Sequence, residues 1–221
     1  MLTLTKRLFA LLLASFLGFP AATFPFETPL SDTAVRDAYF LGQRRDETFA
    51  QFVSNYSRAL PAPAKGPYIQ SVSFFTPYVL TAINSSQHLG IYSAQQAQLD
   101  HDSAPEIVRV IVQIFLTDSY GEFLIRPARQ DSQANHGVML RPADFWRGFR
   151  LHVSQKDQMM IPSAATGEPT FRCTDDGCDL TGATLTFDFP ASAFTDDTAT
   201  VLVTPPEGDP VSVDFDPTSL R

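Results

Sequence analysis

The chain has few of the residues and none of the local motifs by which many enzyme families are defined. Its 221 residues include two cysteines, four histidines and one tryptophan. It contains no G-x-S-x-G nucleophile elbow, no phosphate-binding P-loop, no G-x-G-x-x-G and no H-E-x-x-H. These absences exclude enzymes that depend on such motifs, although a catalytic triad needs no local signature. We therefore expect no cofactor.

Basic residues are scarce in the C-terminal part of the chain. The formal net charge is −8, and residues 171–221 carry ten acidic side chains against two basic ones. An acidic chain is repelled by phosphate backbones, so we expect no nucleic-acid partner. The hydrophobic fraction of 44% is ordinary for a globular protein and excludes global disorder.

Several C-terminal acids alternate with apolar residues and therefore point away from the core. Asp188, Asp214 and Asp216 show this pattern. Two interpretations remain open. The acidic face pairs inside the molecule with an arginine-rich stretch that includes Arg147 and Arg150, or it stays free for solvent, a cation or a basic partner.

The N-terminus has the features of a secretory signal. Two basic residues precede the apolar stretch Leu8–Phe19, and a cleavage site near Ala22 makes residues 1–22 the signal peptide. The uncharged run continues to Phe26, so an uncleaved membrane anchor is the alternative. The protein is thus expected to be exported, periplasmic or extracellular, and to contact a membrane only through this segment.

Residues 23–66 are predicted to form a helical segment that ends in a proline-rich linker. Ser31 can cap a first helix, and Gly42 is expected to end it. A second helix is predicted from Asp46 to Ala59, and one apolar stripe along it is expected to pack on the following domain. The stripe contains Phe49, Phe52, Val53 and Tyr56.

Residues 67–221 are predicted to form a mainly β domain, which makes the chain α+β by content. An antiparallel β-sandwich or open barrel of about seven to nine strands, with one or two short helices, fits its alternating segments and turns. Ile107–Leu116 reads as a central strand, and Phe123–Ile125 as its hairpin partner. Residues 130–137 are polar and are expected to form a loop.

The two cysteines flank an Asp-Gly turn. For an exported chain this arrangement predicts a disulfide between Cys173 and Cys178 that closes a hairpin. Free thiols or a catalytic pair are the alternatives. Asp175, Asp176 and Asp179 around the same turn suggest a calcium site, although their spacing does not match a helical calcium loop.

One cluster contains a histidine and carboxylates. His101, Asp102 and Glu106 could form a general-base site, because a carboxylate can orient an imidazole, or they could bind a metal. The competing interpretation is a solvated loop at the end of a helix. An exported hydrolase that uses these residues is therefore the alternative function.

The strongest candidate for binding is an aromatic and basic stretch. Trp146 lies beside Arg147 and close to Arg150, a combination that suits sugar rings, anionic ligands or a protein partner. The competing interpretation is a core tryptophan with its arginines outside. The sequence favours a non-catalytic binding protein, or an envelope-associated structural protein, with an unknown protein, small molecule or sugar as partner.

Overall fold

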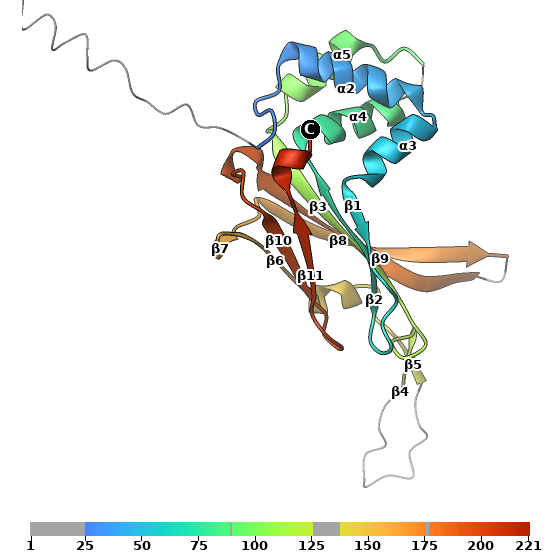
Figure 1. The fold of residues 1–221 in the computed structure, drawn as a ribbon. Helices are drawn as coiled ribbons and strands as arrows, with labels where there is room; N and C mark the ends of the chain where they lie inside the picture. Colours follow the sequence, from blue (N-terminus) through green and yellow to red (C-terminus); the bar gives the residue numbers. More distant parts are fainter. Residues whose placement is uncertain (1–24, 89, 126–137, 176) are drawn as a thin grey trace, which may run out of the picture.

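Two antiparallel sheets packed face to face, with helices at one end, make up most of the fold (Figure 1). The computed structural model describes residues 25–88, 90–125, 138–175 and 177–221. One sheet contains β1 (Ser57–Ala59), β2 (Tyr68–Phe75), β3 (Ile107–Phe115), β9 (Gly177–Pro190) and β8 (Ala164–Thr174), in this order. The other contains β11 (Val211–Phe215), β10 (Ala199–Thr204), β6 (Arg150–Gln155) and β7 (Gln158–Met160).

The predicted mainly β, antiparallel class is confirmed, but the expected number of strands was too low. Eleven strands and four α-helices are present in the described residues. The undercount arises from the short strands β1, β4, β5 and β7, which have three residues each. Three residues are too few for an alternating pattern to stand out in a sequence.

Aromatic and β-branched side chains fill the space between the two sheets. Alternate residues of β3, from Val108 to Ile114, are almost completely buried, as expected for a central strand. Phe74 of β2 stacks on Phe215 of β11 with ring centroids 5.3 Å apart, and meets Phe194 edge-on at 5.2 Å. These contacts join the two sheets into one core.

The helices cover one end of the sandwich. They are α2 (Asp32–Arg44), α3 (Glu47–Ser54), α4 (Pro77–Gln87) and α5 (Ala94–Asp102). The Ser31 hydroxyl accepts a hydrogen bond from the backbone N–H of Ala34, which confirms the predicted N-cap. A second, smaller core lies between α2, α4 and α5, with Val35, Ala38 and Ala82 fully buried.

The prediction that Gly42 ends the first helix was wrong. The helix continues to Arg44 and ends at Arg45, which has a left-handed φ of 51°. Gly42 is buried against α4, where a Cβ would lie 2.1 Å from the carbonyl oxygen of Ala82. The glycine is therefore required for close contact between two helices, not for a turn.

The predicted second helix is too long. Asp46 caps α3, but the helix ends at Ser54, and Ser57–Ala59 forms β1 beside β2. The apolar stripe still packs inward as predicted, and Phe52 contacts Tyr56 edge-on at 5.2 Å. Pairing with β2 satisfies the backbone of residues 57–59, so tertiary structure overrides the helical pattern there.

The predicted pairing of residues 123–125 with the central strand was also wrong. Strand β4 (Phe123–Ile125) pairs with β5 (Val138–Leu140) in a separate two-stranded sheet. Both edges of β3 are already occupied, by β2 on one side and β9 on the other. The loop predicted at 130–137 lies outside the described residues.

The hairpin of β8 and β9 extends beyond the sandwich as an arm (Figure 1). Residues 170–179 of this arm are exposed wherever the structure describes them. The end of the arm carries the Cys173–Cys178 disulfide, which confirms the predicted bond. No helix in the described residues is long and apolar enough to cross a membrane, and the predicted signal peptide lies outside them.

Candidate functional site

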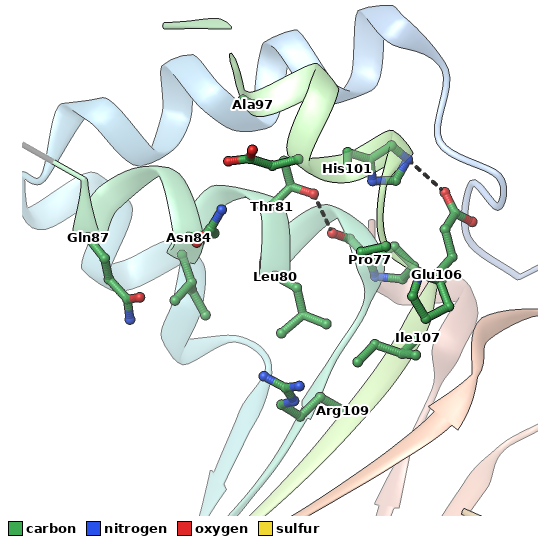
Figure 2. A pocket seen from close by; sticks show the side chains of 14 residues that line it. Pro77, Leu80, Thr81, Asn84, Gln87, Ala97, His101, Glu106, Ile107 and Arg109 are labelled. Carbon is green, nitrogen blue, oxygen red and sulfur yellow. Dashed lines mark hydrogen bonds and ion pairs between the residues drawn. The ribbon is translucent and has the colours of Figure 1, made fainter. Parts of the chain in front are cut away.

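A cavity of about 310 Å³ lies between α4, α5 and the first residues of β3 (Figure 2). We refer to it as the helix–sheet cavity. Its polar lining consists of Thr81, Asn84, Gln87, Asp100, His101, Glu106 and Arg109, and its apolar lining includes Leu80, Ile83 and Ile107. The volume falls at the small end of the range for ligand pockets, and the mixture of polar and apolar walls is typical of them.

The position of each polar group follows from the local structure. Residues of α5 that face the cavity are spaced by three and four positions, as one face of a helix requires. This face contains Ala97, Asp100 and His101, and Ala104 lines the cavity just after the helix ends. After the helix ends, Pro105 leads the chain into β3, which brings Glu106 and Arg109 into the lining of the cavity.

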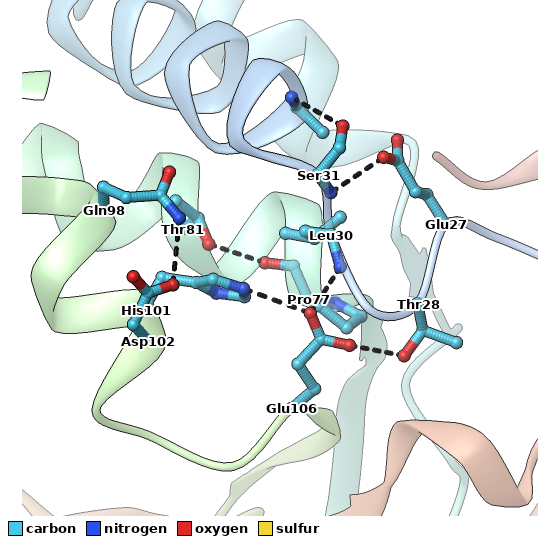
Figure 3. A network of polar contacts seen from close by, with 11 residues as sticks. Glu27, Thr28, Leu30, Ser31, Pro77, Thr81, Gln98, His101, Asp102 and Glu106 are labelled. Carbon is cyan, nitrogen blue, oxygen red and sulfur yellow. Dashed lines mark hydrogen bonds and ion pairs between the residues drawn. The ribbon is translucent and has the colours of Figure 1, made fainter.

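His101 and Glu106 form a polar contact in the wall of the cavity. The imidazole Nε2 lies 3.1 Å from Oε1 of Glu106, and the two side chains are only 14% and 15% exposed. The same carboxylate accepts hydrogen bonds from the Thr28 hydroxyl and from the backbone N–H of Leu30 (Figure 3). Glu106 therefore links the chain before α2 to α5 and to the start of β3.

The contact with Glu106 leaves the other imidazole nitrogen available. With its proton on Nε2, a neutral His101 presents the lone pair of Nδ1 as an acceptor. Nδ1 has no hydrogen-bond partner within the described residues. Every buried side-chain nitrogen and oxygen atom in these residues does have a partner, so an atom without one is not buried. Nδ1 is therefore accessible to solvent.

The predicted third member of this cluster lies elsewhere. Asp102 is exposed on the other side of α5, where it accepts a hydrogen bond from Gln98 Nε2 at 2.9 Å. Asp100 lines the cavity in its place, about one turn of helix after Ala97. The helical spacing from the buried Ala97 was the signal that could have separated the two aspartates.

The ionisable groups around the cavity are strongly hydrogen-bonded. Asp100 accepts from Gln96 Nε2 at 2.7 Å and from the Tyr92 hydroxyl at 2.9 Å, and these two bonds lower its pKa. Burial and the bond to Asp100 raise the pKa of Tyr92 to about 12. Arg109 binds Asp188 through Nε and Nη2 at 2.7 and 2.9 Å, which raises the arginine pKa.

The predicted aromatic and basic stretch lies at the other end of the sandwich. The partly buried Trp146 packs on the backbone of Gly167, where a Cβ would lie 2.4 Å from the ring. Arg147 lies over the indole at 4.8 Å and pairs with Asp144 at 3.4 Å, while Arg150 is exposed at the start of β6.

A second cavity of about 250 Å³ is lined by Trp146, Arg147, Phe149, Ala165, Thr166, Leu185 and Phe187. A binding role for this stretch stays a prediction.

The acids of the C-terminal strands have partners other than the two arginines considered above. Asp188 binds Arg109, and Asp214 accepts from the Thr200 hydroxyl at 2.7 Å. Asp216 caps the final 3₁₀ helix by accepting from the backbone N–H of Thr218 at 3.0 Å. These three acids therefore accept hydrogen bonds from residues of the C-terminal half of the chain or from Arg109 of β3.

The disulfide joins directly opposed residues of β8 and β9, with their Cα atoms 4.0 Å apart. A disulfide of this kind belongs to a non-cytoplasmic, oxidising compartment. Asp175 and Asp179 are exposed beside it, whereas Asp176 lies outside the described residues. Among the described residues no group of three or more metal-binding side chains is assembled, and calcium at this turn stays a prediction.

No protein-family model and no curated protein matches the chain.

Proposed function

We propose that the chain is an exported protein, periplasmic or extracellular, that binds a small ligand in the helix–sheet cavity without transforming it. The observation that carries the proposal is the cavity itself, whose lining combines hydrogen-bonding groups with the apolar side chains of Leu80, Ile83 and Ile107. The disulfide and the predicted signal peptide at residues 1–22 support export.

The bonding of two polar groups favours binding over catalysis. Both oxygens of Glu106 hold other parts of the chain, so this carboxylate stabilises the shape of the cavity. The Thr81 hydroxyl donates to the carbonyl of Pro77 at 3.0 Å and is not directed toward His101 as a nucleophile. A preformed cavity that needs little rearrangement is suited to binding.

The proposal is tested by filling the cavity. Ala104 is exposed and lines the cavity, so Ala104→Phe places a ring inside it without altering the core. We expect compounds from a panel of amines, alcohols, carboxylates and sugars to raise the Tm of the wild type but not that of Ala104→Phe. Ala50→Phe, on the exposed side of α3, is the matched control and should respond like the wild type.

Equal responses of Ala104→Phe and wild type to every compound would show that ligands bind elsewhere. A panel without any stabilising compound would instead favour the envelope-associated structural role. The cavity near Trp146 provides a second place to map binding if the first variant has no effect.

A second candidate function is hydrolysis, favoured by the open Nδ1 of His101. The bond from Nε2 to Glu106 orients the ring as in a carboxylate–imidazole pair, so Nδ1 could remove a proton from water. Chromogenic esters offered to the purified protein test this function. Activity that is lost in His101→Gln and retained in Asp102→Asn would support hydrolysis, and activity unchanged by His101→Gln would exclude it.

A further inference from the structure

The charges that line the helix–sheet cavity do not cancel. Asp100 and Glu106 contribute two carboxylates, and Arg109 is the cationic member of the lining. The guanidinium is already neutralised by its two bonds to Asp188, which pairs with it across β3 and β9. The field inside the cavity is therefore negative, and a partly enclosed site strengthens that field relative to bulk water.

The polar atoms left over for a ligand are mainly acceptors. Asn84 donates through Nδ2 to the Tyr92 hydroxyl at 3.3 Å, which leaves its Oδ1 without a partner in the described residues. His101 Nδ1 is likewise open, and each Asp100 oxygen has accepted one bond while retaining a second lone pair. On the donor side, Arg109 Nη1 and the amide of Gln87 have no hydrogen-bond partner in the same described residues.

We propose that the helix–sheet cavity selects a small organic cation, namely a primary amine with a short alkyl group. An ammonium group offers three donors and no acceptor, which matches the acceptors of Asn84, Asp100 and His101. The alkyl group lies against Leu80, Ile83 and Ile107, and its length is limited by the volume of about 310 Å³. This inference rests on the proposed binding function and names the ligand class for it.

Three probes with one alkyl group and different head groups test the inference by isothermal titration calorimetry. They are n-butylammonium, n-butanol and butyrate at equal ionic strength and neutral pH. We expect n-butylammonium to bind with a dissociation constant about tenfold or more below that of n-butanol, and butyrate to bind more weakly than both. Ala104→Phe should weaken all three.

Two aspartates on α5 provide a matched pair of variants. Asp100→Asn removes one of the two carboxylate charges from the cavity and should reduce the preference for the amine over the alcohol. Asp102→Asn removes an equal charge from the exposed side of the same helix and should retain most of that preference. Far-ultraviolet circular dichroism of both variants verifies that the helix is intact.

The outcomes separate the ligand class from the binding function. Alcohol or butyrate binding that equals or exceeds amine binding, and is lost in Ala104→Phe, would overturn the cationic ligand but retain the cavity as a binding site. Amine binding that is equally weakened by Asp100→Asn and Asp102→Asn would reflect general surface charge and would also overturn the inference. The absence of binding by all three probes would overturn it as well, while the wider panel would still test the proposed function.

Discussion

The helical end of the sandwich and the β8–β9 arm are stabilised in different ways. At the helical end, α2 packs on α4 and α5, and Glu106 joins residues that are more than 70 positions apart in the sequence. The arm is held by pairing between neighbouring strands and by one disulfide, and its end is exposed. We infer that the first region unfolds with the whole molecule, whereas the second can open by itself.

The largest effect is expected from the core that both sheets share. Phe74→Ala removes a fully buried ring and should lower the free energy of unfolding by about 4 kcal/mol, as measured by urea denaturation. Phe171→Ala on the arm is the control, because this ring is 49% exposed, and its effect should be below about 1 kcal/mol. Similar losses in the two variants would contradict the inference that the arm opens separately from the core.

The contact between α2 and α4 is expected to tolerate no added atom. Gly42→Ala should destabilise the protein by about 2 kcal/mol, because its methyl group would meet the backbone carbonyl of Ala82. Gly121→Ala, whose Cβ would be 3.4 Å from its nearest neighbour, should change stability by less than about 0.5 kcal/mol. Thermal unfolding of the two variants side by side measures the difference.

A smaller effect is expected from the carboxylate that links three segments. Glu106→Gln replaces one acceptor oxygen by a donor, so one bond to Thr28, Leu30 or His101 is lost, at a cost of about 1 kcal/mol. Glu168→Gln on the exposed arm is the matched control and should leave the urea midpoint unchanged. An unchanged midpoint in Glu106→Gln would show that the segments hold together without this carboxylate.

The smallest global effect is expected from removal of the disulfide. The chain-entropy estimate for so short a loop is about 2 kcal/mol, but it applies to the arm, so the double variant Cys173→Ser/Cys178→Ser should lose less than about 1 kcal/mol of global stability. Hydrogen exchange of residues 170–180 should become faster, while exchange in β3 stays the same. Faster exchange in both would show that the arm unfolds together with the core.

Patterns that depend on neighbouring residues could be predicted from the sequence, whereas contacts between distant segments could not. The Ser31 cap, the central strand β3 and the Cys173–Cys178 bond all follow from local spacing. The interpretation of Gly42 failed because glycine is required both at turns and where two helices lie close together, and the sequence does not distinguish the two cases. The partner of β4 could not be inferred, since alternation identifies a strand but not its neighbour.

The candidate site shows the same division. His101 and Glu106 are close in sequence, so their contact could be predicted from the local sequence. Arg109 could be assigned to the polar side of a strand, but its bonds to Asp188 depend on the register between β3 and β9. The cavity itself arises from the packing of two helices on the start of a strand, which no single segment encodes.

The disulfide at the end of the arm also bears on how the chain matures. With two cysteines in the sequence, a single intramolecular pairing exists, so oxidation has no wrong isomer to correct. The thiols come from residues 173 and 178, and their encounter requires only a hairpin turn and not the finished sandwich. Bond formation can therefore precede, accompany or follow folding with the same product, and its rate would be set by the available oxidant rather than by an isomerase.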